Sequence, residues 1–244
     1  MLDFWEKKFN VPYQTFIPKD EIQIASIPHE TTITEDWDCA DSDSLNCDLT
    51  WTELQSDTDI VSNVAVSQAG SATTSTARAD SDLSTDDHYS QAILNRVGGS
   101  SGNGQDYGTI VRKDDTTTIT FYHGRIGTTA APDVLQLFKL VTGTSTQLGS
   151  NVEQAASLPD TVKTQADGST ITFYFNDVEK FNETDTAITG NLRTGIRNRH
   201  ITGWVDSTNG KASFNDFQSE DLSASSHQNL IQGVSTIQGV SILN

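Results

Sequence analysis

The feature that most constrains the fold is a strict alternation of side chains in the second half of the chain. Between Thr170 and Asn176, apolar residues occupy the odd positions and more polar residues the even ones. Successive side chains of a strand point to opposite faces, so this pattern is typical of a half-buried β-strand. A similar run covers 162–166, and the intervening Asp167 and Gly168 tolerate the positive φ angles of a two-residue turn. The pattern therefore predicts a β-hairpin over 162–176.

Further strand-like runs recur along the chain, separated by turn-rich stretches such as the Gly- and Ser-rich segment 98–104. The stretches between them are too rich in turn residues for a long helix, and the strands do not alternate with helices as in βαβ units. Only 34% of residues are hydrophobic and 20% charged, which suits many short strands joined by polar turns. We expect antiparallel sheets packed face to face. The other predicted strands are 60–66, 89–97, 107–112, 117–123, 134–141, 193–198 and 212–217.

The chain divides into three parts, with the strand-rich domain at 34–220. Residues 1–33 combine aromatic and aliphatic residues with three prolines, and a short amphipathic helix is expected from Leu2 to Phe9. Residues 221–244 begin with a serine-rich joint and repeat Gln-Gly-Val-Ser at 232–235 and 238–241. Apolar segments need a surface to lie on, so 1–33 is predicted to be an attachment arm and 221–244 a tail that adds strands to another surface.

The net charge restricts the classes of partner. There are 15 Lys and Arg against 33 Asp and Glu, a formal charge of −18, so a phosphate backbone would be repelled and no nucleic acid is expected as a partner. No stretch approaches the ~20 apolar residues of a membrane span, and Met1 to Asn10 lacks the features of a secretory signal. We expect a soluble protein made in the cytoplasm, with no signal peptide and no membrane insertion.

Cys39 and Cys47 lie close together in an acidic loop, and no further Cys or nearby His completes a zinc site. Both a disulfide and two free thiols are compatible with this spacing. A reducing cytoplasm favours the free thiols.

One stretch of sequence resembles a known family. Asp36-Trp37-Asp38-Cys39-Ala40-Asp41, followed by Leu45 and Trp51-Thr52, resembles the opening of the concanavalin A-like (laminin G-like) lectin/glucanase sandwich domains found in phage and bacterial surface proteins. Cys39 stands where a basic residue is usual. The resemblance implies an all-β, antiparallel two-sheet jelly-roll sandwich over 34–220 and leaves both ends unexplained, so the extended N-terminal arm and the C-terminal tail of the predicted fold rest on the residues alone. Further segments that match in the family's order are 60–63, 88–92, 137–141, 167–169, 194–196 and 215–217.

The resemblance also raises the question of catalysis, since the family includes glycoside hydrolases. Their retaining chemistry requires two carboxyl groups about 5 Å apart, usually supplied by Glu-x-Asp-x-x-Glu on one strand. Here Glu183 and Asp185 supply the first half of that pattern, but position 188 is Ile and the segment has the character of a loop. No Gly-x-Ser-x-Gly elbow is present either. We expect the protein not to be an enzyme.

Sugar binding by a lectin-like domain would use an aromatic ring with hydrogen-bonding groups beside it, because a sugar stacks its apolar face and pairs its hydroxyls. Tyr122, His123 and Trp204 are the candidate ligand-binding residues. The alternative for all three is ordinary cross-strand packing.

The acidic loop is a candidate calcium site, because calcium takes six to eight oxygen ligands. Asp36 with Asp216 is the predicted metal-binding pair, since the first and last strands of this fold are expected to be neighbours. The alternative is a set of solvated turn carboxylates. The loop carboxylates are Asp36, Asp38, Asp41, Asp43 and Asp48.

Together these observations predict a non-catalytic, lectin-like virion structural protein, such as a capsid decoration, head-fibre or tail-associated protein. It would contact other virion proteins through 1–33 and 221–244, form a homo-oligomer, and take a surface glycan as its candidate ligand. A stand-alone carbohydrate-binding module and a glycoside hydrolase are the alternatives.

Overall fold

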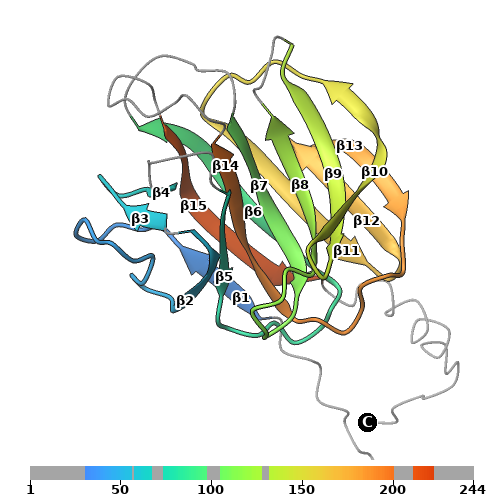
Figure 1. Cartoon of the computed structure of the whole chain (residues 1–244), viewed down its shortest axis with the longest axis horizontal. Helices are drawn as coiled ribbons and strands as arrows, with labels where there is room; N and C mark the ends of the chain where they lie inside the picture. Colours follow the sequence, from blue (N-terminus) through green and yellow to red (C-terminus); the bar gives the residue numbers. More distant parts are fainter. Residues whose placement is uncertain are drawn as a thin grey trace, which may run out of the picture.

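A computed structural model describes residues 31–56, 58–67, 74–97, 105–127, 132–200 and 211–222. In these ranges all regular secondary structure is β-strand, arranged as two antiparallel sheets packed face to face (Figure 1). The predicted class, an all-β two-sheet sandwich, is confirmed. None of the described segments is a helix long and apolar enough to cross a membrane.

The eight-stranded sheet has the order β13-β12-β11-β6-β15-β4-β3, with β1 also paired to β15. Its strands are β1 (Thr32–Glu35), β3 (Thr58–Ile60), β4 (Ala65–Ser67), β6 (His88–Val97), β11 (Asp160–Asp167), β12 (Thr170–Phe175), β13 (Val178–Thr184) and β15 (Lys211–Asp221).

The seven-stranded sheet has the order β10-β9-β8-β7-β14-β5-β2. Its strands are β2 (Trp51–Gln55), β5 (Thr74–Ala79), β7 (Gln105–Lys113), β8 (Phe121–Gly127), β9 (Val134–Val141), β10 (Thr144–Glu153) and β14 (Arg193–His200).

The core between the sheets follows from the alternation in the strands. In β12, Ile171, Phe173 and Phe175 are buried, as their odd positions predict. At one end of the sandwich, the buried ring of Trp51 lies 5.1 Å from that of Phe217, edge to face. Aromatic pairs of this geometry contribute about 1 kcal/mol beyond their buried area. The sandwich is therefore held by side chains from both sheets.

The predicted hairpin is present, with a turn that differs by one residue. Asp167 still pairs with Thr170, so the two-residue loop is Gly168-Ser169 and not Asp167-Gly168. Gly168 takes the positive φ, 53°, that the turn needs. The glycine position was predicted correctly, while the strand extends one residue further than the polarity of Asp167 suggested.

Three other predictions about local structure were wrong. The run 60–66 is not one strand, because Ser62 and Asn63 adopt φ of 53° and 63° and separate β3 from β4. The run 117–123 becomes a strand only at Phe121. The segment expected to be a loop around Glu183 is the end of β13.

The first and last strands of the sandwich are neighbours, as expected. Thr32 pairs with Glu220 at one end of the β1–β15 ladder, and Glu35 pairs with Phe217 at the other. The backbone N–H of Thr31 also donates to Asp221 at 3.0 Å. Most of the two terminal segments, the helix expected at Leu2–Phe9 and the stretch 98–104 lie outside the described residues.

Cys39 and Cys47 form a disulfide, with their Cα atoms 6.1 Å apart. The expectation of free thiols was therefore wrong. It rested on the redox state of a compartment, whereas the fold brings the two residues within disulfide distance and packs both against the core.

Candidate functional site

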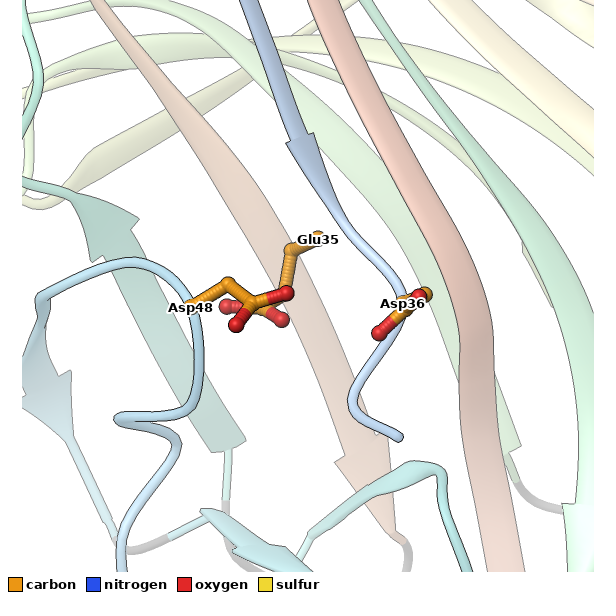
Figure 2. A group of neighbouring side chains, drawn as sticks. All are labelled: Glu35, Asp36 and Asp48. Carbon is orange, nitrogen blue, oxygen red and sulfur yellow. The ribbon is translucent and has the colours of Figure 1, made fainter. Parts of the chain in front are cut away.

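The predicted metal region contains one compact group of carboxylates: Glu35, Asp36 and Asp48, whose oxygens lie within 4.8 Å of one another. Figure 2 shows the side chains of Glu35 and Asp48 turned toward each other, with Asp36 just beyond the end of β1. Asp36 and Asp48 are exposed and Glu35 is buried. Asp48 belongs to the acidic loop identified in the sequence, but Glu35 was not among the candidates.

Glu35 is already engaged by the protein itself. Its Oε2 accepts the backbone N–H of Leu49 at 2.9 Å and the indole N–H of Trp51 at 3.3 Å, and its Oε1 accepts the backbone N–H of Trp37 at 3.2 Å. Asp36 and Asp48 are exposed, and Glu35 already accepts three hydrogen bonds from the protein. These three carboxylates do not supply the six to eight oxygens of a calcium site. The group therefore accounts for the anchoring of the loop, and it does not make a complete metal centre.

Asp216, the other half of the predicted pair, does not belong to this group. Glu35 pairs with Phe217 at the end of the ladder, so Asp36 is the residue just after β1 and Asp216 is the residue of β15 just before Phe217. Asp216 is exposed and lies where the register of β15 shifts between Phe214 and Phe217. Calcium binding by Asp36 and Asp216 stays a prediction.

The predicted sugar-binding residues are separated by the alternation of β8. Tyr122 faces the core: its hydroxyl donates to Asp185 at 2.7 Å and accepts the N–H of Ile188 at 3.2 Å. Burial, together with the hydrogen bond to Asp185, raises the pKa of Tyr122 to about 12. Its ring is fully buried and offers no face to a sugar. Trp204 lies outside the described residues.

His123 lies on the opposite face of β8, the outer face of the seven-stranded sheet. Its side chain is also buried, with 1% of the residue exposed, and neither ring nitrogen has a hydrogen-bond partner among the described residues. Burial, followed by repulsion from Arg197 and Arg125, places its pKa well below the usual range. The imidazole is therefore neutral at physiological pH.

The strand register groups three arginines around His123. Arg125 on β8 is opposite Gly108 on β7, and Gly108 is opposite Arg197 on β14. Arg199, two residues further along β14, is opposite Asp106. We call Arg125, Arg197 and Arg199 the arginine cluster. Gly108 at its centre has no side chain, and a Cβ there would lie 2.7 Å from Nε2 of His123.

Aromatic rings and amides border the arginine cluster. The guanidinium of Arg125 lies 4.4 Å from the centroid of the half-buried ring of Phe138, at a distance typical of a cation–π contact. Arg125 also donates to Oε1 of Gln136, with N–O distances of 3.0 and 2.7 Å. Gln136 in turn donates to Asn151 at 2.9 Å. These contacts hold the planar groups of β8, β9 and β10 in fixed orientations.

Sequence reasoning identified His123 but missed the arginine cluster, because strand register, which a single sequence does not give, brings the arginines together. One signal was available: Arg193 and Arg197 occupy odd positions of the predicted strand 193–198, and Arg199 directly after it continues the alternation, in a chain where acidic residues outnumber basic ones.

The comparisons with known proteins bear on the fold. No protein-family model and no curated protein matches the sequence. Among solved structures, the chain is similar to the carbohydrate-binding module CBM66 from Bacillus subtilis, with a TM-score of 0.54, 16% identity and coverage of 71% of this chain and 98% of that one. It is also similar to a Bacillus licheniformis β-glucanase, with a TM-score of 0.53, 11% identity and coverage of 78% and 98%. The domain thus has the concanavalin A-like lectin/glucanase fold.

Proposed function

We propose that this chain is a non-catalytic, lectin-like virion protein that binds saccharides through the outer face of its seven-stranded sheet. The observation that carries the proposal is the border of the arginine cluster, where the half-buried ring of Phe138 adjoins the fixed polar groups of Arg125, Gln136 and Asn151. A ring edged by oriented donors and acceptors suits a ligand that is apolar on one face and rich in hydroxyls at its rim. The fold shared with a carbohydrate-binding module supports this proposal.

The small number of carboxylates on this sheet supports binding without hydrolysis. The strands β9, β8, β7 and β14 contain one carboxylate, Asp106. Asp106 is ion-paired with Arg125 at 2.7 Å. A pair of carboxyl groups flanking a glycosidic bond therefore has no counterpart on these four strands. Asp185, from the incomplete sequence motif, accepts hydrogen bonds from Tyr122 and Lys139 instead.

The virion part of the proposal rests on the two ends of the sandwich. The strands next to the terminal segments, β1 and β15, pair side by side, so both segments join the domain at neighbouring points. A domain joined at one place to other virion proteins, and to further copies of itself, would keep the outer face of its seven-stranded sheet available for a ligand.

Two measurements on the full-length chain test these proposals. A glycan array should give reproducible binding to a saccharide class, with no release of reducing sugar from the bound glycan. Released sugar would instead identify a hydrolase, and an array without any binding would refute the saccharide proposal. Gradient sedimentation of the native source material should place the chain in virions or large assemblies, whereas a lone monomer would refute the virion role.

A further inference from the structure

The charges of this protein are segregated. Although the whole chain carries −18, the four strands β9, β8, β7 and β14 contain seven of its 15 basic residues and one acidic residue, Asp106. These adjacent strands are the middle of the seven-stranded sheet. The basic residues are Lys139 on β9, Arg125 on β8, Arg112 and Lys113 on β7, and Arg193, Arg197 and Arg199 on β14.

Most of these basic side chains have an evident partner. Lys139 pairs with Asp185, Lys113 with Asp114, Arg112 with Asp87, and Arg193 with Asp82. The arginine cluster differs, because all of its ion pairs with described residues go to one carboxylate, that of Asp106. Arg125 is 2.7 Å and Arg199 is 3.8 Å from the same Asp106 oxygen. Arg197 has no ion pair with any described residue.

Arg197 is therefore a cation that makes no ion pair among the described residues, and the nearby Asp106 offsets its charge only in part. Its Nε is buried and has no hydrogen-bond partner among the described residues, while its guanidinium lies 5.8 Å from the centroid of the Phe121 ring. Burial, together with repulsion from Arg125 and Arg199, lowers its pKa to about 10, so it remains charged at neutral pH. A largely buried charge that is only partly offset is costly, and an anion placed beside it recovers part of that cost.

His123 supplies an independent sign of a missing ligand. Both ring nitrogens are buried beside Arg125 and Arg197 and have no hydrogen-bond partner within the part of the chain that the structure describes, although buried polar atoms in native proteins almost always have one. A neutral imidazole carries one N–H donor. It can therefore add a hydrogen bond to the same anion without becoming charged.

From this geometry we infer that the saccharide bound by the chain is anionic and that its acidic group lies against Arg197, Arg125 and Arg199 beside His123. The inference rests on the proposed saccharide-binding function and specifies its ligand class. A planar guanidinium matches the two oxygens of a carboxylate, and it also binds a sulfate ester. The hydroxyls of a neutral sugar would add no negative charge to the part that Asp106 already supplies beside Arg197. The ring of Phe138 and the amide of Gln136 would then contact the neighbouring sugar unit.

Calorimetry on the full-length protein tests this inference with three matched probes: a hexuronic acid tetrasaccharide, a sulfated tetrasaccharide and a neutral hexose tetrasaccharide. We expect at least one acidic probe to bind about tenfold or more tightly than the neutral one. The preference should shrink as salt is raised. Whichever acidic probe binds identifies the acidic group as a carboxylate or a sulfate.

Single substitutions test whether the arginine cluster causes the preference for the acidic probe. Arg197→Gln and Arg199→Gln should each weaken binding of the acidic probe by about tenfold or more and leave binding of the neutral probe nearly unchanged. Arg193→Gln removes the same charge from the same strand, and it should leave both affinities unchanged. Arg199 is 48% exposed in its side chain, so its variant tests the inference even if replacing Arg197 disturbs folding.

The outcomes separate the two proposals. Equal or tighter binding of the neutral probe, or acidic binding that survives both cluster variants, would overturn the anionic assignment and leave saccharide binding intact. Failure of all three probes, together with a blank glycan array, would overturn both.

Discussion

Glu35 accepts the indole N–H of Trp51 at 3.3 Å and so joins β1 of the eight-stranded sheet to β2, the edge strand of the other sheet. The same carboxylate accepts the backbone N–H groups of Trp37 and Leu49. We expect Glu35→Ala to leave three donors without this acceptor, two of them in buried hydrogen bonds, and to lower the free energy of unfolding by about 3 kcal/mol. Equilibrium denaturation with urea measures the change.

The control for this substitution is the exposed neighbour Asp36. Asp36→Ala removes a carboxylate from the same acidic group and should change stability by no more than about 0.5 kcal/mol. Equal losses from the two variants would show that Glu35 does not anchor the loop.

His123 should make the folded state sensitive to mild acid. Its pKa in the folded protein lies well below the usual 6.5 because it is buried near two arginines. The unfolded chain thus takes up the proton first as the pH falls, so this contribution to stability is present above about pH 6.5 and is lost below it. His123→Leu should lessen the loss of stability between about pH 6.5 and 5, and at pH 7.5 it should be as stable as the wild type or more so.

Denaturation curves across this pH range provide the test. His88, whose pKa is also lowered by burial, remains in both proteins, so part of the acid sensitivity should persist in the variant. Superimposable pH profiles of wild type and His123→Leu would contradict the role assigned to His123.

Gly108 should be intolerant of any side chain. A Cβ there would clash with the backbone carbonyl of Gly124 and lie 2.7 Å from Nε2 of His123. Gly108→Ala is expected to cost about 3 kcal/mol, through overpacking within the sheet. Gly190→Ala is the matched control, since its Cβ would meet open space and only its φ of 73° adds strain of about 1 kcal/mol. Thermal denaturation should rank the wild type above Gly190→Ala and that variant above Gly108→Ala.

Loss of the disulfide should weaken the acidic loop. Cys39 and Cys47 are eight positions apart, and a loop of this size corresponds to about 2–3 kcal/mol of stabilisation in the chain-entropy model. The Cys39→Ser/Cys47→Ser variant should unfold at lower urea concentration than the oxidised wild type. Dithiothreitol should lower the urea midpoint of the wild type toward that of the variant and leave the midpoint of the variant unchanged. An unchanged wild-type midpoint in the presence of the reductant would contradict the expectation.

The fold could be predicted where the sequence states local geometry clearly. The hairpin of β11 and β12 combines alternating apolar and polar side chains with a glycine at the required positive φ, and both features can be recognised in the sequence. β10 was missed because its surface is mostly exposed and its residues, from Thr144 to Glu153, are largely polar. β3 and β4 were merged because the β-branched residues around Ser62 and Asn63 favour a strand, although Ser and Asn are common in turns and both adopt positive φ here.

The candidate site was harder to predict, because its chemistry depends on strand register. His123 was selected as an aromatic beside Tyr122, yet neighbours on a strand face opposite sides, and the structure places only His123 among the arginines. Arg125 and Arg197 meet across Gly108, a residue without functional atoms of its own. An alternating set of basic residues in an acidic chain is the signal that remains useful for sequences of this kind.

The pairing of β1 with β15 has a mechanical consequence. Thr32 lies opposite Glu220 at the end of the ladder where both terminal segments leave the sandwich. A pull that separates these two segments would load the ladder one residue pair at a time, and the strands would unzip in sequence. A pull on both segments together, against the far end of the sandwich, would instead be shared along the whole ladder. The domain should therefore withstand a force on the end of the sandwich far from the terminal segments much better than a force that pulls the two terminal segments apart.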